Sequence, residues 1–250
     1  MRLNVFLQRA GIGSRREAER MVEQGRVSVN GAQALATTPV EEGDEVKLDG
    51  KAISPAKREL PRLFLLNKPL DVLVTNRDHQ NRATVFELPA LQDQSLPRLM
   101  SVGRLDVNSE GLLILSSDGP LAQAMMSPDN ALERVYRVRV KGRFTERELA
   151  MLAKGVIIEG IRYRGALFEE EQDKGGRTNS WYRVVLTEGK NREIRRLVQH
   201  FGGQVNRLIR TQYGPFELGD LEPGQLWEVP PRAVMRLVEK LKIQGAEEEQ

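Results

Sequence analysis

Residues 103–119 read GRLDVNSEGLLILSSDG, which is a polar loop, an apolar run and an Asp-Gly turn in succession. The apolar run at residues 112–115 has the length and composition of a buried strand. Just before it, the loop presents the carboxylate of Asp106. Enzymes often place a catalytic side chain on a loop that a rigid sheet holds in position. An isolated loop aspartate is more commonly a plain turn residue, so the role of Asp106 depends on the rest of the chain.

The composition is that of a globular protein, with 40% hydrophobic and 29% charged residues in a chain of 250. Lysine and arginine number 38 against 35 aspartate and glutamate, so the net charge of +3 does not identify a partner. Cysteine is absent and there are two histidines. Disulfides, thiolate zinc sites and cysteine nucleophiles are therefore excluded, and no conventional metal centre is expected. Any catalysis must use carboxylate, hydroxyl or basic groups.

No apolar run approaches the roughly 20 residues that span a bilayer, and the N-terminus lacks the hydrophobic core of a signal peptide. We therefore expect a cytoplasmic protein with no membrane partner. Residues 245–250 form an acidic tail, which makes the rest of the chain more basic than the net charge suggests.

The first 50 residues predict a small domain made of two helices and a β-hairpin. Apolar residues at helical spacing and a Ser14–Glu17 capping box indicate the helices, and a glycine follows each of them. Asn30-Gly31 is the strongest short signal for a hairpin. The elements are expected at residues 3–10, 14–24, 27–29 and 46–48.

Four arginines decorate these helices, namely Arg9, Arg15, Arg16 and Arg20. Charged helix faces are usually just solvated, so the arginines alone do not indicate a ligand. However, the runs GSRREA at 13–18 and GRVSVNG at 25–31 resemble the alpha-L-type RNA-binding domain, which a small-subunit ribosomal protein also carries. The resemblance implies that the arginines contact RNA phosphates, which fix register without reading the base sequence.

Residues 51–62 carry two prolines and several charges and are expected to form a linker. A second domain is expected at residues 63–230. Its strands are predicted at 63–66, 72–75, 112–115, 136–140 and 181–186, and one of its helices at 145–154. Because strands and helices do not alternate strictly, we predict an α+β fold with a largely antiparallel mixed sheet. Residues 231–250 are expected to form a helix that packs on this domain, followed by the acidic tail.

A second basic segment, GKNREIRRLVQHFGG at residues 189–203, predicts an amphipathic helix. Its apolar side is formed by Ile194, Leu197, Val198 and Phe201. About 200° round the helix, a polar side carries Arg192, Arg195, Arg196 and Gln199, and Lys190, Arg207 and Arg210 extend the basic surface. Exposed charge is the usual state of arginine, but three arginines on one side suit bidentate pairing with phosphate or carboxylate. An arginine beside Asp106 would hold that carboxylate in its charged form.

Four motifs occur in the order and spacing of ribosomal RNA pseudouridine synthases of the RsuA/RluB type. They are GRLD at 103–106, GLLIL with the following Asp-Gly at 111–119, ERVY at 133–136 and GKNREIRRL at 189–197. The chain resembles this family from residue 2 to about residue 230, and linked motifs are far more specific than any one alone. The resemblance implies an isomerisation in which uracil is detached from its ribose at nitrogen, rotated while enclosed, and rejoined through carbon. No ATP, metal or redox cofactor is expected for it.

The resemblance assigns Asp106 as the essential carboxylate, which acts as a nucleophile toward the ribose or the base, or as a base that removes a ribose proton. Arg195 is expected to be its partner, whereas Arg192 and Arg196 are expected to meet phosphates. Tyr136 is expected to stack on the uracil or to assist proton transfer at C5, although strand tyrosines are common without such a role. This chemistry needs the target nucleotide outside its stack, so base flipping is implied.

Three further cations are expected to contact RNA, namely Lys68, Arg104 and Lys190. Arg104 would fill the space that the flipped base leaves, or bind the RNA backbone. Lys68 belongs to an Asn-Lys-Pro motif and is expected to be structural or phosphate-facing. Asp71 stands where the family usually has a glycine, two residues after the proline, so the conformation of that loop stays open.

Ribosomal RNA or a ribosomal subunit precursor is the expected partner, bound by a monomer. Large-subunit rRNA is the preferred target, from closer similarity at residues 191–197 and 207–214, and small-subunit rRNA is the alternative. Two other classes are a non-catalytic RNA-binding assembly factor and a hydrolase that uses a carboxylate nucleophile on a small substrate. Four motifs in family order argue against both.

Overall fold

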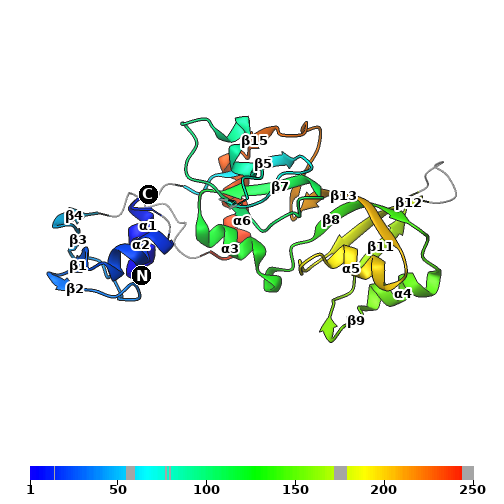
Figure 1. Cartoon of the computed structure of the whole chain (residues 1–250), viewed down its shortest axis with the longest axis horizontal. Coiled ribbons are helices and arrows are strands. Elements are labelled where there is room, and N and C mark those ends of the chain that lie inside the picture. The colour runs from blue at the N-terminus through cyan, green and yellow to red at the C-terminus, as the bar shows by residue number, and fades with distance from the viewer. Residues whose placement is uncertain (14, 55–59, 77, 79, 172–178, 244–250) are drawn as a thin grey trace. The chain divides into compact units, whose positions relative to one another are not determined.

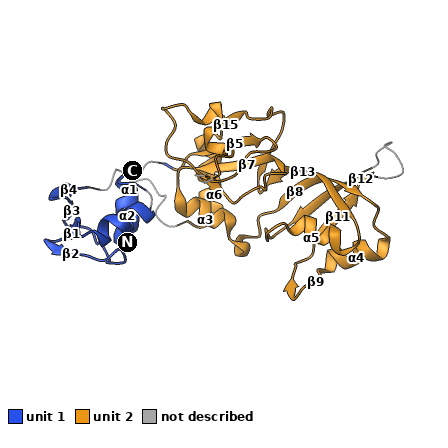
Figure 2. Ribbon diagram, viewed as in Figure 1, with its two compact units in different colours: residues 1–60 blue, residues 61–250 orange. Residues whose placement is uncertain are grey.

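The computed structural model describes residues 1–13, 15–54, 60–76, 78, 80–171 and 179–243. The chain divides into two compact units, Met1–Leu60 and Pro61–Gln250, which have different colours in Figure 2. The first unit has one hydrophobic core, and the second unit has two. Among the described residues, no helix is both long and apolar enough to cross a lipid bilayer.

The first unit contains the two predicted helices and the predicted hairpin. Its elements are α1 (Leu3–Arg9), α2 (Arg15–Glu23), β1 (Val27–Val29), β2 (Ala32–Gln33), β3 (Val46–Leu48) and β4 (Lys51–Ile53). The strands form one antiparallel sheet in the order β2-β1-β3-β4. At the hairpin, Asn30 and Gly31 have φ values of 50° and 79°, the left-handed conformation that an Asn-Gly turn requires. The helix-helix-hairpin prediction is confirmed.

The sheet of the first unit extends beyond its predicted end at residue 50. β4 pairs with β3, with Lys51 opposite Leu48, so residues 51–53 belong to this sheet and not to the predicted linker. Lys51 and Ala52 are both exposed, so the segment lacks the apolar alternation by which a half-buried strand is recognised. Ser14, which was expected to cap the second helix, lies outside the described residues.

The second unit is built on one mixed sheet (Figure 1), which has nine strands in the described part of the chain. They are β5 (Leu63–Lys68), β6 (Met100–Val102), β7 (Glu110–Ser116), β8 (Arg134–Lys141), β11 (Leu167–Glu170), β12 (Asn179–Leu186), β13 (Gln204–Tyr213), β14 (Phe216–Glu217) and β15 (Leu226–Glu228). The path runs β11-β12-β8-β13-β7-β5-β15, with β14 beside β13 and β6 beside β7. Among the described pairs only β13–β7 is parallel, which confirms the predicted α+β fold. A separate ribbon pairs β9 (Ile157–Ile158) with β10 (Ile161–Arg162).

Helices cover both faces of this sheet. They are α3 (Gly119–Met126), α4 (Glu146–Lys154), α5 (Glu193–His200) and α6 (Pro231–Lys240), with 3-10 turns η1 (Val85–Glu87), η2 (Pro89–Leu91) and η3 (Pro128–Asn130). Buried residues of α4 and α5 belong to one core, and those of α3 and the C-terminal α6 to the other. β5 alternates between the cores, with Phe64 and Leu66 in the first and Leu63 and Leu65 in the second. A continuous apolar run thus becomes a central strand that is buried on both faces.

One predicted strand is not part of the sheet. Residues 72–75 make a single described bridge, from Leu73 to Thr84, and Val72 is buried in a core. A loop that buries apolar side chains has the same short apolar run as a strand, so the pattern does not separate the two. Just before it, Asp71 adopts a φ of 60°, and its N–H donates to the Val107 carbonyl at 3.0 Å. Asp71 therefore makes the bend that a glycine was expected to make.

Candidate active site

Asp106 lies in the loop between β6 and β7. Gly103 begins this loop with a φ of 72°, and the Ser109 N–H donates to the Asp106 carbonyl oxygen at 3.0 Å. β7 then runs into the middle of the sheet, which gives the loop a rigid support. The Asp106 side chain is 34% exposed. It is therefore accessible to a substrate from one side and held by protein on the other.

A buried lysine holds this loop from within. Lys68 is 0% exposed, and its Nζ donates to the carbonyl oxygens of Ser109 at 2.7 Å and Pro69 at 2.8 Å. Burial lowers the pKa of Lys68 to about 8, against the opposing effect of nearby carboxylates, first among them Asp71. An RNA phosphate cannot reach a side chain with no exposed surface, so the prediction that Lys68 contacts RNA is wrong. Its contacts are those of a structural residue.

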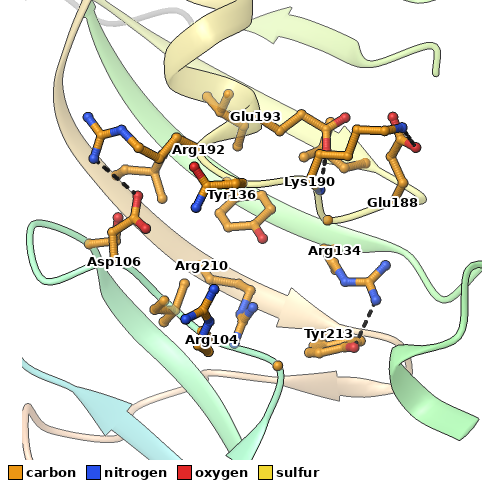
Figure 3. Close-up of a pocket in the computed structure, with 18 of the residues that line it drawn as sticks. Arg104, Asp106, Arg134, Tyr136, Glu188, Lys190, Arg192, Glu193, Arg210 and Tyr213 are labelled. Atoms are coloured by element: carbon orange, nitrogen blue, oxygen red, sulfur yellow. Dashed lines mark hydrogen bonds and ion pairs between the residues drawn. The ribbon is translucent and has the colours of Figure 1, made fainter. Parts of the chain in front are cut away.

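Two guanidinium groups face the Asp106 carboxylate. Arg192 Nη1 lies 3.6 Å from Asp106 Oδ2, as drawn in Figure 3, and Arg195 Nε lies 3.9 Å from it. Arg192 precedes α5 with a φ of 52°, so it is not part of the polar helix side predicted from the sequence. Arg195 is 15% exposed and donates through Nη2 to the Asn108 carbonyl at 2.8 Å. The structure thus brings Arg195 and Asp106 together and adds Arg192 to the pair.

Two positively charged groups thus lie beside one negatively charged group. Burial, and then the nearby Arg192, lower the pKa of Arg195, whereas Asp106 raises it. A guanidinium nevertheless stays charged under all ordinary conditions. Two cations within 4 Å of one carboxylate stabilise its negative charge.

Asp106 opens into a cleft of about 780 Å³, a volume within the usual range for small-molecule sites. Tyr136, on β8, is 7% exposed and forms part of the cleft wall. Among the charged and tyrosine residues that the sequence singled out, the cleft is lined by Arg104, Asp106, Tyr136, Lys190, Arg192, Arg195 and Arg210. Three of the four sequence motifs, at residues 103–106, 133–136 and 189–197, therefore meet at one site that has room for a nucleotide.

Comparison with known proteins identifies this arrangement. A family model described as RNA pseudouridylate synthase matches residues 62–200, and a model of the S4 domain matches residues 1–46. The chain belongs to the RNA pseudouridine synthase family. An uncharacterized RNA pseudouridine synthase of Rickettsia felis is 42% identical over 91% of this chain and 96% of its own length.

This chain is also similar to relatives that have more specific names. Ribosomal large subunit pseudouridine synthase B of Xanthomonas campestris is 41% identical over 97% of this chain, and the chain spans 50% of the length of that protein. A crystal structure of a pseudouridylate synthase matches 95% of this chain and 100% of its own, with 25% identity and a TM-score of 0.65. The predicted family, the isomerase activity and the N-terminal RNA-binding module are confirmed.

The other RNA contacts that the sequence predicted for this synthase are one arginine of the second unit and the arginines of the first unit. Arg196 is not among the cleft residues, and its Nη1 donates to the Tyr163 hydroxyl at 3.3 Å. The arginines of the first unit are on its helices: Arg9 on α1, with its side chain outside the described residues, and the exposed Arg15, Arg16 and Arg20 on α2. Their contacts with RNA stay predictions.

Lys190 forms an ion pair with Glu188, an acidic residue that was not predicted from the sequence to be part of the site. Its ammonium group contacts the Glu188 carboxylate, which also accepts the Arg164 N–H at 2.7 Å. Burial acts to raise the pKa of Glu188, but the contacts with Lys190 and Arg164 outweigh burial and leave the pKa lowered. Lys190 therefore lines the cleft as a paired cation, and its predicted contact with RNA would have to compete with Glu188.

Glu193 is a second buried acid in this segment. It is 4% exposed, and its Oε2 accepts the Lys190 N–H at 2.8 Å. Burial raises the pKa of Glu193 to about 7, and Glu188 adds to the shift. The sequence spacing could have predicted that Glu193 is buried. Glu193 lies four residues before the buried Leu197, so both residues lie on the same side of α5.

The cleft wall that carries Arg210 depends on a close approach of β7 and β13. Gly111 of β7 lies opposite Arg210 of β13 in the parallel pair. A Cβ at Gly111 would lie 2.4 Å from the Arg210 carbonyl oxygen, and Gly111 has a φ of 99°. Only glycine fits this position without moving the strand that carries Arg210.

Proposed function

We propose that this synthase converts a uridine of large-subunit ribosomal RNA to pseudouridine, with Asp106 as its essential catalytic group. The observation that carries the proposal is a carboxylate on a supported loop, facing two guanidinium groups in a nucleotide-sized cleft. The name of the Xanthomonas campestris relative supports a large-subunit target. We also place the enzyme in the cytoplasm, because its proposed substrate is ribosomal RNA.

The reaction replaces one glycosidic bond with another. The bond from C1′ to N1 breaks, the uracil turns, and a bond from C1′ to C5 forms, while C5 loses a proton and N1 gains one. Asp106 is available to attack the ribose, to attack the base, or to remove a ribose proton. Each route begins from an ionised carboxylate, which Arg192 and Arg195 stabilise.

Access to the cleft requires the uridine to leave its stack. Tyr136 is almost fully buried in the cleft wall, and Asp106 is two-thirds covered. A base inside a helix cannot reach groups that lie this deep, so we infer that the target is flipped out of an RNA loop or bulge. The Tyr136 ring offers an apolar surface against which the uracil can stack.

The test uses unmodified large-subunit and small-subunit rRNA fragments, with new pseudouridines mapped by carbodiimide-blocked primer extension. We expect a new stop on the large-subunit fragment with the wild-type enzyme and none with Asp106→Asn. Asp220→Asn is the matched control, because the Asp220 side chain is exposed, and it should behave as wild type.

The outcomes separate the parts of the proposal. A stop confined to the small-subunit fragment would overturn the choice of target alone. The absence of any stop with wild-type enzyme would overturn ribosomal RNA as the substrate. Full activity of Asp106→Asn would overturn the catalytic assignment.

A further inference from the structure

One wall of the cleft carries two arginines and two tyrosines on neighbouring strands. Arg134 of β8 lies opposite Tyr213 of β13, and Tyr136 of β8 lies opposite Arg210 of β13. A register shift after Arg210 changes the alternation of β13. Arg210 and Tyr213 are three residues apart, yet both line the cleft (Figure 3). A bulge that re-aims a side chain in this way is a common feature next to active sites.

Both arginines are buried and held in fixed orientations. Arg134 is 6% exposed and donates to the Tyr213 hydroxyl at 2.9 Å and the Leu132 carbonyl at 3.1 Å. Arg210 is 2% exposed and donates through Nε to the Leu112 carbonyl at 2.7 Å. Their guanidinium carbons lie 4.6 and 5.1 Å from the centre of the Tyr213 ring, so they are within about 10 Å of each other.

Neither arginine forms an ion pair with an acid among the described residues. Arg207, on the same strand as Arg210, does so, with its Nε 2.6 Å from Glu110. Arg210 Nη2 is instead buried without any described hydrogen-bond partner. A buried cation and a buried unpaired donor both cost free energy, which a bound anion would recover. At Asp106 the cleft has cations paired with a carboxylate, whereas the wall with Arg134 and Arg210 has cations without a paired anion among the described residues.

We propose that Arg134 and Arg210, with the exposed Arg104 on the same cleft, bind a backbone phosphate of the RNA strand next to the target uridine. This inference rests on the proposed function, because it takes RNA as the ligand. Guanidinium groups pair well with phosphate oxygens, and Arg210 Nη2 is a donor that no described group of the protein satisfies.

The experiment compares the binding of uridine, uridine 3′-monophosphate and uridine 5′-monophosphate by calorimetry. Wild-type enzyme should bind one of the monophosphates ~10-fold more tightly than uridine, as expected for hydrogen bonds between charged groups. Arg210→Gln should reduce this preference to less than about threefold. Arg139→Gln is the matched control and should keep it, because Arg139 is on β8 but exposed.

Two results would overturn the phosphate site: equal affinity of wild-type enzyme for uridine and both monophosphates, or a full preference retained by Arg210→Gln. If Arg210→Gln does not unfold cooperatively, Arg104→Gln replaces it, because Arg104 is exposed and its loss leaves the wall packed. An unchanged preference in Arg104→Gln would then show that Arg104 does not bind the phosphate. The comparison of uridine with its monophosphates on wild-type enzyme would still decide whether a phosphate site exists. Pseudouridine formation on rRNA is measured separately. If the enzyme forms pseudouridine but does not prefer a monophosphate over uridine, only the phosphate site is overturned. If it prefers a monophosphate but forms no pseudouridine, only the proposed function is overturned.

Discussion

The arginines of the two units work in opposite surroundings. On α2 of the first unit, Arg15 and Arg16 are exposed to solvent. In the cleft of the second unit, Arg195 and Arg210 are mostly buried, and backbone carbonyls hold them at 2.8 and 2.7 Å. Water and salt screen the first pair, whereas the second pair acts through protein of low polarizability. The same side chain thus suits an adjustable contact with RNA in one unit and a fixed charge beside the chemistry in the other.

The largest expected effect tests whether the cleft is as rigid as this contrast requires. Gly111→Ala places a Cβ 2.4 Å from the Arg210 carbonyl oxygen at a φ of 99°, so we expect it to lower the free energy of unfolding by about 4 kcal/mol. Gly160→Ala, at a φ of 77° with nothing within 4 Å, should cost only about 1 kcal/mol. Denaturant unfolding followed by tryptophan fluorescence reports this unit, which contains both tryptophans. Equal losses in the two variants would argue against close packing at Gly111.

The next effect separates chemistry from binding. Arg195→Gln removes a buried charge 3.9 Å from Asp106 and should lower the single-turnover rate at saturating enzyme about 100-fold. Its affinity for RNA should change little, because Arg195 is largely covered. Filter binding and rapid-quench kinetics measure the two quantities independently. A loss of affinity with an unchanged rate would make Arg195 an RNA contact instead.

The next prediction concerns the pH dependence of stability, which the buried Glu193 is expected to cause. Glu193 has a pKa of about 7 in the folded enzyme against an ordinary value of 4.5. Between these values the unfolded chain has lost the proton that the folded protein keeps, so stability falls as pH rises from 4.5 to 7 and levels off above.

Glu193→Gln should remove that loss and be about 2 kcal/mol more stable relative to wild type at pH 8 than at pH 5. Unfolding by urea at both pH values measures the difference. The exposed Glu217→Gln is the control and should show no such gain. A constant difference between Glu193→Gln and wild type at the two pH values would refute the shifted titration.

The smallest effect concerns the exposed arginines. Arg15→Ala with Arg16→Ala should weaken RNA binding ~10-fold at moderate salt and reduce the slope of log affinity against log salt by about 2. The single-turnover rate of bound substrate should stay at the wild-type value. A large fall in that rate at saturating enzyme would contradict the division of labour between the units.

Local pattern was sufficient for most of the secondary structure. The apolar spacing of Ile194, Leu197 and Val198 predicted the buried side of α5, and all three are buried. The capping residue Thr145 predicted the start of α4, where its side chain accepts the Glu148 N–H. These features depend on residues within a few positions of one another, so the chain carries them locally. The four motifs likewise identified the family, because each of them is a continuous stretch of sequence.

What the sequence by itself determined is therefore many of the elements, the α+β class, the RNA-binding module and the family, whereas the environment of each charge was decided by tertiary structure. The Arg134–Tyr213 hydrogen bond joins residues 79 apart and the Arg210–Leu112 hydrogen bond joins residues 98 apart. Lysine is usually a surface residue, yet Lys68 is fully buried. Burial and partners depend on how distant strands pack, and these set whether a cation is exposed, holds a loop or faces the Asp106 carboxylate.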